Sequence, residues 1–526
     1  MFVLAFALAV LQLFSLSLSV TGSLAIDNVP ARCCHFPSLV DTTLDQLQAG
    51  LSKGCFTSVN AYIGRIADVN STLQVVAALN PDAIAIARRL DVERKHGKLR
   101  GPLHGLPVLI KGNIGVADKM NTTSNGFAAS WLLCSLGAEL PEDSTIVAKL
   151  RESGVVILEM AGLSEWANFR SSNSSNGLNA YGGQVAGAYV PRQDPSGSSS
   201  GSGVASDLGL SFATLGTEVV YLGFIFSTSL HIARGDSGLM SVPRRAAASL
   251  ALVNKTTLPH MDTIGPMTRT VKDAAKLLQV IAGPDSNDNY TSAFPFDHVP
   301  NYVAACQRSA LNGMRIGLPT DVLEQVAPEI LENFHAAVKA MTDSGAIIVN
   351  CSALEESNTS PLRWEVISAD FVNDLANYFS KLKTNPNNIN TLSDLRNFTQ
   401  AFPLDAYPDR DTGSRDGALA LGYNITSPEF WPKYQKARLA SIGSGILGSP
   451  IVTVPMGAWP AGTEVVSPPR DLVIRAPEIT MGLSFLGDFW SEATLIVMAY
   501  AYEQQSLKRR TLSRYIEPKT ELKDVV

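Results

Sequence analysis

The chain has 526 residues, of which 45% are hydrophobic and 17% charged, and its formal net charge is −6. This length can bury a large core, although length alone leaves the number of domains open. Lys and Arg are scattered rather than clustered, so the charge pattern gives no support to a nucleic-acid partner or to binding at an anionic membrane surface.

The first 25 residues differ from the rest of the chain. Residues 2–20 carry no charge, and the segment 23–25 supplies the small residues that a signal peptidase reads. A positive n-region is missing and the apolar run is nearly long enough to span a bilayer, so a membrane anchor is the competing interpretation. Because no basic stop-transfer cluster follows, we predict a cleaved signal peptide over 1–25, an extracellular location and no stable membrane association after cleavage.

Sequons and cysteines agree with secretion. N-x-S/T sequons, which predict a glycoprotein, occur at Asn70, Asn121, Asn173, Asn254, Asn289, Asn350, Asn358, Asn397 and Asn424. The six cysteines match no zinc-binding spacing and are Cys33, Cys34, Cys55, Cys134, Cys306 and Cys351. Their even number favours disulfides over free thiols, with the pairing open, and the adjacent first two cysteines would tie down the N-terminal end of the mature chain.

The first half of the chain alternates between helices and strands. Polar and apolar residues recur at helical spacing over 42–51 and 59–70, and 81–98 is an amphipathic helix that begins with proline. A buried strand is predicted at 106–110, and a second strand at 155–158 follows a helix at 144–153. Strand after helix, repeatedly, predicts a layered α/β fold.

A second set of elements appears late in the chain. The predicted strands are 314–319, 346–349 and 451–455, and the predicted helices are 328–344 and 489–507. Between them, the segment 373–432 is polar, and 385–390 is typical of a surface excursion. Because neither an internal repeat nor a clean linker is present, we predict one large domain over 26–526.

The Gly/Ser-rich segment 194–203 is the first candidate for chemistry. Such a composition most often marks a flexible linker. A linker should be followed by polar chain, however, and residues 204–215 are small and apolar. The loop therefore enters the buried interior, where its hydroxyl and N–H groups suit an oxyanion or a reacting carbonyl.

Two catalytic interpretations of this loop compete. Residues 197–201 match the G-x-S-x-G elbow of an α/β-hydrolase-type esterase, with Ser199 as the nucleophile. That chemistry needs a downstream histidine, usually close to the C-terminus, and the last histidine is His335. The other interpretation uses Lys111, which emerges from the predicted strand 106–110. Burial lowers the pKa of a lysine, so this side chain could accept a proton from one serine that relays it from a second, nucleophilic serine.

At these residues the chain resembles the amidase signature family of Ser–Ser–Lys hydrolases, in its fungal secreted branch. Residues 105–113 are similar to the family block G-(I/L)-P-x-x-x-K-D-N, with Gly112 in place of the aspartate. Further similar blocks are 164–170 (SEWANFR), the loop 194–203, 448–457 and 482–503. The resemblance spans residues 42–510.

The resemblance implies a mixed, twisted sheet surrounded by helices, no metal or cofactor, and hydrolysis of a small-molecule amide through an acyl-enzyme. Lys111 would be the base, and Ser198 the bridging serine, held by a cis peptide bond. Gly197, Ser199 and Gly238 would belong to the segments that position the backbone and the substrate.

The pattern breaks where the nucleophile is expected. Residues 216–218 begin the family block G-T-(D/E)-x-x-G-S, but the nucleophile position then holds Leu222. The block resumes at 236–243, so residues 219–235 are predicted to be an aberrant insertion that comes from an unspliced short intron or an annotation error. A genuine inserted β-hairpin is the alternative. With the gap closed, Leu239 takes the nucleophile position. Ser237 and Ser241 flank it, and we choose Ser237 because a glycine follows.

This break leaves two hypotheses of different class. The first is an amidase that uses Lys111, Ser198 and Ser237. The second is a secreted protein of the same fold in which catalysis is impaired or lost, because leucine cannot attack a carbonyl. The esterase that would use Ser199 is the third and least favoured hypothesis.

Overall fold

The structure, a computed structural model, describes residues 34–120, 138–171, 173–218, 238–241, 263–286, 288–323, 326–351, 360–444, 450–467 and 472–526. The predicted signal peptide (1–25), the predicted insertion (219–235), Cys33, Cys134 and Ser237 lie outside these ranges.

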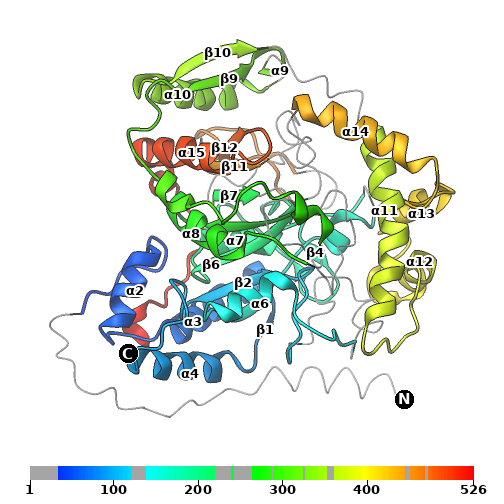
Figure 1. Cartoon of the computed structure of the whole chain (residues 1–526), viewed down its shortest axis with the longest axis horizontal. Helices are drawn as coiled ribbons and strands as arrows, with labels where there is room; N and C mark the ends of the chain where they lie inside the picture. Colours follow the sequence, from blue (N-terminus) through cyan, green and yellow to red (C-terminus); the bar gives the residue numbers. More distant parts are fainter. Residues whose placement is uncertain are drawn as a thin grey trace.

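A single eight-stranded sheet forms the centre of the molecule (Figure 1). In spatial order its strands are β1 (Val76–Leu79), β3 (Val156–Ala161), β2 (Pro107–Lys111), β6 (Ala213–Glu218), β8 (Thr263–Thr268), β7 (Gly238–Ser241), β11 (Ile451–Ala458) and β12 (Thr480–Leu486). The pairs β3–β2 and β2–β6 are parallel and the other neighbours antiparallel, so the predicted mixed α/β architecture is confirmed. Two small sheets pair β9 (Arg315–Pro319) with β10 (Ile347–Cys351) and β4 (Leu178–Asn179) with β5 (Gly183–Gln184).

Helices surround this sheet. They are α2 (Leu44–Ser52), α3 (Ser58–Leu73), α4 (Ala83–Lys95), α6 (Thr145–Glu152), α7 (Ser200–Asp207), α8 (Val271–Ile281), α9 (Thr320–Leu323), α10 (Pro328–Asp343), α11 (Ser360–Lys381), α12 (Leu392–Ala401), α13 (Gly413–Ala420), α14 (Phe430–Ser444) and α15 (Glu492–Ser506). Helix α7 packs on β2, β3, β6 and β8, while α8 contacts both α6 and α15.

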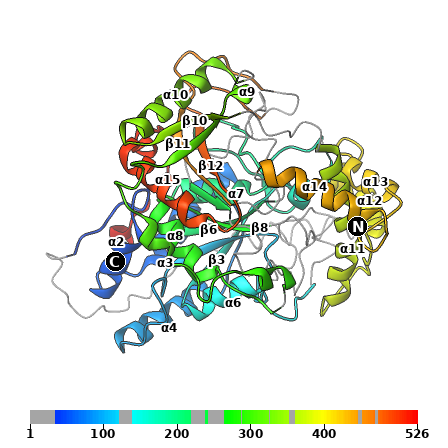
Figure 2. The ribbon, with the colours of Figure 1, turned by 45° about the horizontal axis from the view of Figure 1, so that its top comes forward.

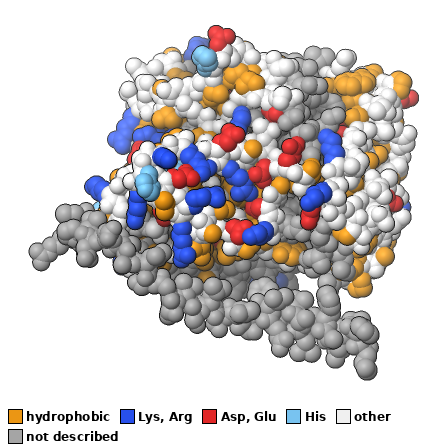
Figure 3. All heavy atoms as spheres, turned by 60° about the horizontal axis from the view of Figure 1, so that its bottom comes forward, with side chains coloured by type: hydrophobic (Ala, Val, Ile, Leu, Met, Phe, Trp, Pro, Cys, Tyr) orange, Lys and Arg blue, Asp and Glu red, His pale blue; other side chains and the backbone are white. Residues whose placement is uncertain are grey.

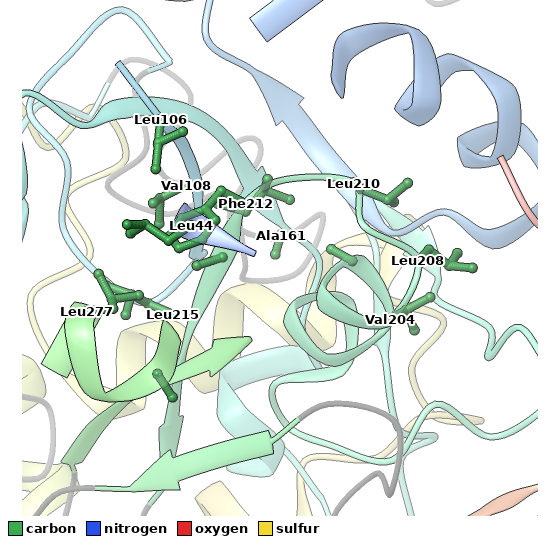
Figure 4. Close-up of a cluster of buried hydrophobic side chains, with 14 of the residues drawn as sticks. Leu44, Leu106, Val108, Ala161, Val204, Leu208, Leu210, Phe212, Leu215 and Leu277 are labelled. Carbon is green, nitrogen blue, oxygen red and sulfur yellow. The ribbon is translucent and has the colours of Figure 1, made fainter. Parts of the chain in front are cut away.

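The main hydrophobic core lies where α7 meets the parallel strands. Figure 4 shows Val204 and Leu208 of α7 in one buried cluster with Val108 of β2, Leu215 of β6 and Leu277 of α8. Strands β2 and β3 are buried along their whole length, as parallel strands covered on both faces are. The apolar run after the Gly/Ser loop therefore serves two elements: its first part completes α7 and its last part enters β6.

Helices α11 to α14 gather at one side of the molecule and have an apolar cluster of their own (Figures 1 and 2). We call residues 360–444, which contain these four helices, the helical unit. The cluster includes Phe371, Leu375 and Leu395, and it reaches the rest of the protein through Leu140, Trp166 and Phe169. The description of 373–432 as a polar segment was incomplete, because its helices bury one apolar side each. The stretch 385–390 is mostly exposed, as predicted.

The cysteine predictions hold in part. Cys34 and Cys55 form a disulfide that ties the N-terminal end to the segment after α2, as expected for a cysteine at that end. Cys306 and Cys351 are free thiols, so the preference for disulfides was wrong for these two.

The surface agrees with the charge pattern of the sequence. On the face drawn in Figure 3, basic and acidic side chains alternate rather than forming a field of one sign. Within the described ranges, no helix combines the length and the apolar character needed to cross a membrane.

Candidate active site

Lys111 ends β2 and its side chain is fully buried. Its Nζ makes hydrogen bonds with Ser198 Oγ at 2.8 Å, Thr217 Oγ1 at 2.7 Å and Thr217 O at 3.3 Å. The parallel pairing of Ile110 with Leu215 explains the contact, because it brings the end of β2 beside Thr217 on β6. The structure thus joins the predicted lysine and the predicted bridging serine, which are 87 positions apart in the chain.

Two further polar residues complete this cluster. Asn113 Nδ2 donates to Thr217 Oγ1 at 3.0 Å, so the threonine hydroxyl accepts from Asn113 as well as contacting Lys111. Sequence reasoning missed both as site residues, although each stood inside a motif that resembles the family. The available signal was that each motif ends just after a buried apolar run, 106–110 and 204–215, although only the first of these was predicted to be a strand.

The Gly/Ser loop is held by its own polar groups before it reaches Ser198. The Asp194 carboxylate accepts from Ser196 N at 2.6 Å and from Asn176 Nδ2 at 3.2 Å. The Gly197–Ser198 peptide bond is cis, and the Ser198 carbonyl accepts from Ser164 N at 3.0 Å. The backbone on both sides of the bridging serine is thereby fixed.

Gly197 stands where a side chain would displace its polar neighbours. A Cβ at this position would lie 2.4 Å from Ser164 Oγ and 2.9 Å from Asn176 Oδ1, well inside van der Waals contact. Gly201 is still more confined, because its Cβ would lie 2.4 Å from Val75 O and 2.6 Å from Gly162 N. These glycines allow the loop and the first turn of α7 to approach the neighbouring backbone closely.

Ser199 has a structural role in this arrangement. Its Oγ donates to Thr217 O at 3.1 Å and accepts from Thr217 N at 3.1 Å, so it ties the loop to β6. A nucleophile elbow would instead direct this hydroxyl to a histidine. The contacts therefore favour Ser199 as a positioning residue, the role that the resemblance implied, over the esterase nucleophile.

Gly238 is not brought to this cluster. It lies on β7 opposite Thr268 of β8, whereas Thr217 pairs with Ile264 of the same strand. Four residues of an extended strand separate these two positions by about 13 Å along the sheet. β8 also stands between β6 and β7. The role of Gly238 in positioning the substrate stays a prediction, and Ser237, its neighbour, is outside the described residues.

Strand β3, the neighbour of β2, carries a carboxyl group at Glu159, close in register to Lys111. Leu109, two residues before the lysine, is its partner in the register. The side chain is fully buried, and neither carboxyl oxygen has a hydrogen-bond partner within the part of the chain that the structure describes. Burial raises the pKa of the Glu159 carboxyl well above its usual range, because the low-dielectric interior disfavours the charged form.

Comparison with known proteins places this geometry in a family. The family model named Amidase matches residues 57–220 and 243–411. A predicted amidase of Arthroderma benhamiae is 45% identical over 552 residues, covering 95% of this chain and 91% of the relative. One of Schizosaccharomyces pombe is 32% identical, covering 79% and 74% respectively.

Solved structures agree. The peptide amidase from Stenotrophomonas maltophilia superimposes with a TM-score of 0.73 at 28% identity, covering 91% of this chain and 99% of that one. A peptide amidase in complex with chymostatin gives a TM-score of 0.74 at 29% identity, covering 90% and 99%. An amidase family protein from Bacillus anthracis shares the fold, with a TM-score of 0.72 at 24% identity. From the matched motifs, the shared fold and these relatives together, this chain belongs to the amidase family and is an amide hydrolase.

Proposed function

We propose that this amidase cleaves a carboxylic amide through an acyl-enzyme, with Lys111 as the base and Ser198 as the proton relay. The observation that carries the proposal is the buried Lys111 Nζ, 2.8 Å from Ser198 Oγ. A neutral amine has two hydrogens and one lone pair. The two Thr217 contacts can use the hydrogens, which leaves the lone pair for the Ser198 hydroxyl.

The reaction follows from this arrangement. Lys111 takes the Ser198 proton as Ser198 takes the proton of the nucleophilic serine, whose oxygen attacks the amide carbonyl. Collapse of the tetrahedral intermediate breaks the C–N bond, and the proton returns along the same path to the leaving amine. Water, deprotonated by the same relay, then attacks the ester and releases the acid. No metal or cofactor takes part in these steps.

For the nucleophile we propose Ser237, with Ser241 as the alternative. The match to the family model is interrupted between residues 220 and 243, around the segment 219–235 that we propose to be an aberrant insertion. A chain without that segment would bring residue 236 next to Glu218, at the end of β6 and close to Thr217. This is the side of the lysine where a nucleophile is needed.

Labelling with a fluorophosphonate probe tests the whole proposal. The purified chain, a version lacking 219–235 and their Lys111→Met forms are treated with the probe, and the labelled peptide is mapped by mass spectrometry. We expect labelling at Ser237 to be strongest in the shortened chain and to be lost with Lys111→Met. Labelling at Ser199 that survives Lys111→Met would establish the esterase instead, and no labelling of either version would establish an inactive relative.

For the substrate we propose a small-molecule amide, with peptide amides as the first compounds to assay. The support is that two solved structures at 28–29% identity are described as a peptide amidase. Release of ammonia from amidated dipeptides, compared with release from short aliphatic amides, would rank the two classes.

We further propose that the protein is a secreted glycoprotein of the fungal branch, with residues 1–25 removed. The Cys34–Cys55 disulfide suits an oxidising compartment. Asn173, Asn350 and Asn397 are exposed and can carry glycans, whereas the Asn70 amide donates to Val76 O at 3.0 Å. Mass spectrometry of the secreted chain before and after N-glycosidase treatment should show glycans at the exposed asparagines, not at Asn70, and a mature N-terminus near residue 26.

A further inference from the structure

A left-handed turn begins two residues after Ser164, the residue that holds the bridging serine. Trp166, Ala167 and Asn168 have φ values of 53°, 52° and 72°, and none of them is glycine. For an L-residue with a side chain this conformation crowds Cβ against the carbonyl oxygen, so three in succession are costly. Such a segment persists only where its surroundings determine it, and strained segments concentrate near functional sites.

On one side, this turn continues into the active site. Ser164 precedes it and donates its backbone N–H to the Ser198 carbonyl at 3.0 Å. The Ser164 hydroxyl accepts from Gly177 N at 2.9 Å and lies 3.5 Å from Ser200 Oγ, at the start of α7. Any rotation of the turn would therefore move the group that fixes the backbone of Ser198.

On the other side, the turn is bound to the helical unit by buried charges. The two oxygens of Glu165 pair with Arg170 and, at 3.1 Å, with Arg415 of α13, and all three side chains are at most 2% exposed. Arg415 also donates to Thr399 of α12 at 2.5 Å, and its guanidinium lies 5.5 Å from the centre of the Trp166 ring.

Aromatic packing adds to these charges. Trp166 meets the ring of Phe371 on α11 edge to face at 5.7 Å, and Phe169 stacks on the same ring at 4.1 Å. Arg170 donates to the carbonyls of Asp405 and Arg410, in the segment between α12 and α13. Helices α11 and α13 and the segment between α12 and α13 thus hold residues 165–170, which include the left-handed turn and border the active site.

We propose that Arg415 is a positioning residue for catalysis: through Glu165 it holds the left-handed turn, and the turn holds Ser198 at the distance that proton transfer to Lys111 requires. The helical unit then has a role in the chemical step, although its contacts with the active site pass through the backbone of Ser164. This inference rests on the relay role proposed above for Ser198.

A pair of arginine variants on the same helical unit separates this role from general stabilisation. Arg415→Met removes the buried contact with Glu165. Arg396→Met is the matched control, because Arg396 pairs with Asp416 of α13 at 2.8 Å on a partly exposed surface and does not contact the turn. Arg415→Lys keeps a positive charge that can reach Glu165, so it tests for rescue.

Two measurements are made on the full chain and on the version lacking 219–235. Amide hydrogen exchange of residues 164–169 and 196–204 should accelerate at least tenfold in Arg415→Met, stay unchanged in Arg396→Met, and recover in part in Arg415→Lys. For turnover of a short aliphatic amide and a peptide amide, kcat should fall at least tenfold in Arg415→Met with KM changed less than threefold.

The inference is overturned if exchange of 196–204 in Arg415→Met equals that of Arg396→Met. It is also overturned if the variant raises KM while leaving kcat intact, since the helical unit would then act on substrate binding alone. Lys111→Met in the same assays keeps the two proposals apart. Full turnover in Lys111→Met would sink the proposed relay, whereas normal loop exchange in Arg415→Met, with Lys111→Met inactive, would sink only the role of Arg415.

Discussion

The central sheet and the helical unit are stabilised in different ways. In the sheet, β2 and β3 are buried along their whole length and joined by continuous backbone pairing. The C-terminal segment adds further contacts: Arg514 pairs with Asp207 at the end of α7, and the fully buried Arg65 donates to Thr520 O at 2.8 Å. This part of the molecule is therefore fixed at many separated points.

The helical unit has a separate apolar cluster, and its buried contacts with the rest of the described chain gather around one turn, while Glu139 makes a second, more exposed connection with Lys383 and Thr384. Trp166 and Phe169 supply apolar contacts to that turn, and Glu165 supplies the charged ones. The polar cluster of Lys111, Ser198, Thr217 and Asn113 belongs to the central sheet and the segments attached to it, and none of its four residues lies in the helical unit. The difference teaches that reacting groups are carried by the part with the most distributed support, and that the helical unit reaches Ser198 most directly through the turn beside Ser164.

The largest expected effect concerns the sheet side. Lys111→Met keeps the length of the side chain but removes Nζ, the atom through which Lys111 contacts Ser198 Oγ and Thr217. General base catalysis contributes typically 10²–10⁴-fold, so we expect turnover of the active form to fall by roughly 10³-fold. Steady-state hydrolysis of a peptide amide measures the loss. Lys119→Met, at an exposed ion pair with Asp82, is the matched control and should retain full activity.

The next largest effect is a loss of stability, compared between one phenylalanine of the helical unit and one of the main core. Phe371→Ala in the helical unit and Phe212→Ala in the main core remove rings that are at most 2% exposed, so each should cost about 3–5 kcal/mol. The loss at Phe212 should lower the free energy of global unfolding. The loss at Phe371 should appear first as local opening of residues 360–444.

Limited proteolysis with mass mapping distinguishes the two phenylalanine variants. Cleavage confined to 360–444 in Phe371→Ala, before any global transition, would support the division into two regions. A single cooperative transition with the same cleavage sites in both variants would show that the two clusters unfold as one.

Much of the sheet was predictable because its signals are local. The buried run 106–110 became β2, and the helix 81–98 became α4 (Ala83–Lys95), since periodicity and proline mark both. Lys111 and Ser198 were predictable as partners only through the family resemblance. Thr217 was not assigned, because its role depends on the pairing of β2 with β6, a contact between strands more than 100 residues apart.

The helical unit was predicted poorly for a related reason. Its segment is rich in polar residues, and its apolar positions, such as Phe371 and Leu395, are spaced along helices that face one another rather than the sheet. The left-handed turn at Trp166 has no sequence signal at all, since neither glycine nor asparagine occupies its first two positions. Tertiary contacts, above all that of Glu165 with Arg415, determine it.

A smaller effect concerns the pH dependence of the sheet. Burial raises the pKa of Glu159, so below the ordinary glutamate pKa both folded and unfolded states are protonated there. As pH rises above about 4.5, the unfolded state loses this proton first, and the free energy of unfolding should fall until the folded pKa is passed. Glu159→Met should remove this contribution and stabilise the protein by about 1–3 kcal/mol near neutral pH.

Denaturant unfolding of wild type and Glu159→Met at about pH 5 and about pH 8 measures that contribution. Burial also raises the pKa of Glu503 to about 7, so the wild-type slope contains more than one group and only the difference between the two proteins is diagnostic. A difference that is the same at both pH values would show that Glu159 is ionised in the folded protein.

The smallest effect is expected at the outer surface of the helical unit. Arg396 pairs with Asp416 at 2.8 Å, with side chains 28% and 44% exposed, and pairs of this kind contribute about 0–1 kcal/mol. Arg396→Met should therefore leave both the unfolding free energy and the turnover almost unchanged. A higher salt concentration should change these two quantities equally in the variant and in wild type. A loss as large as that of Arg415→Met would mean that support for the turn is spread over the whole unit, and the local connection inferred from Glu165 would no longer explain how the two regions communicate.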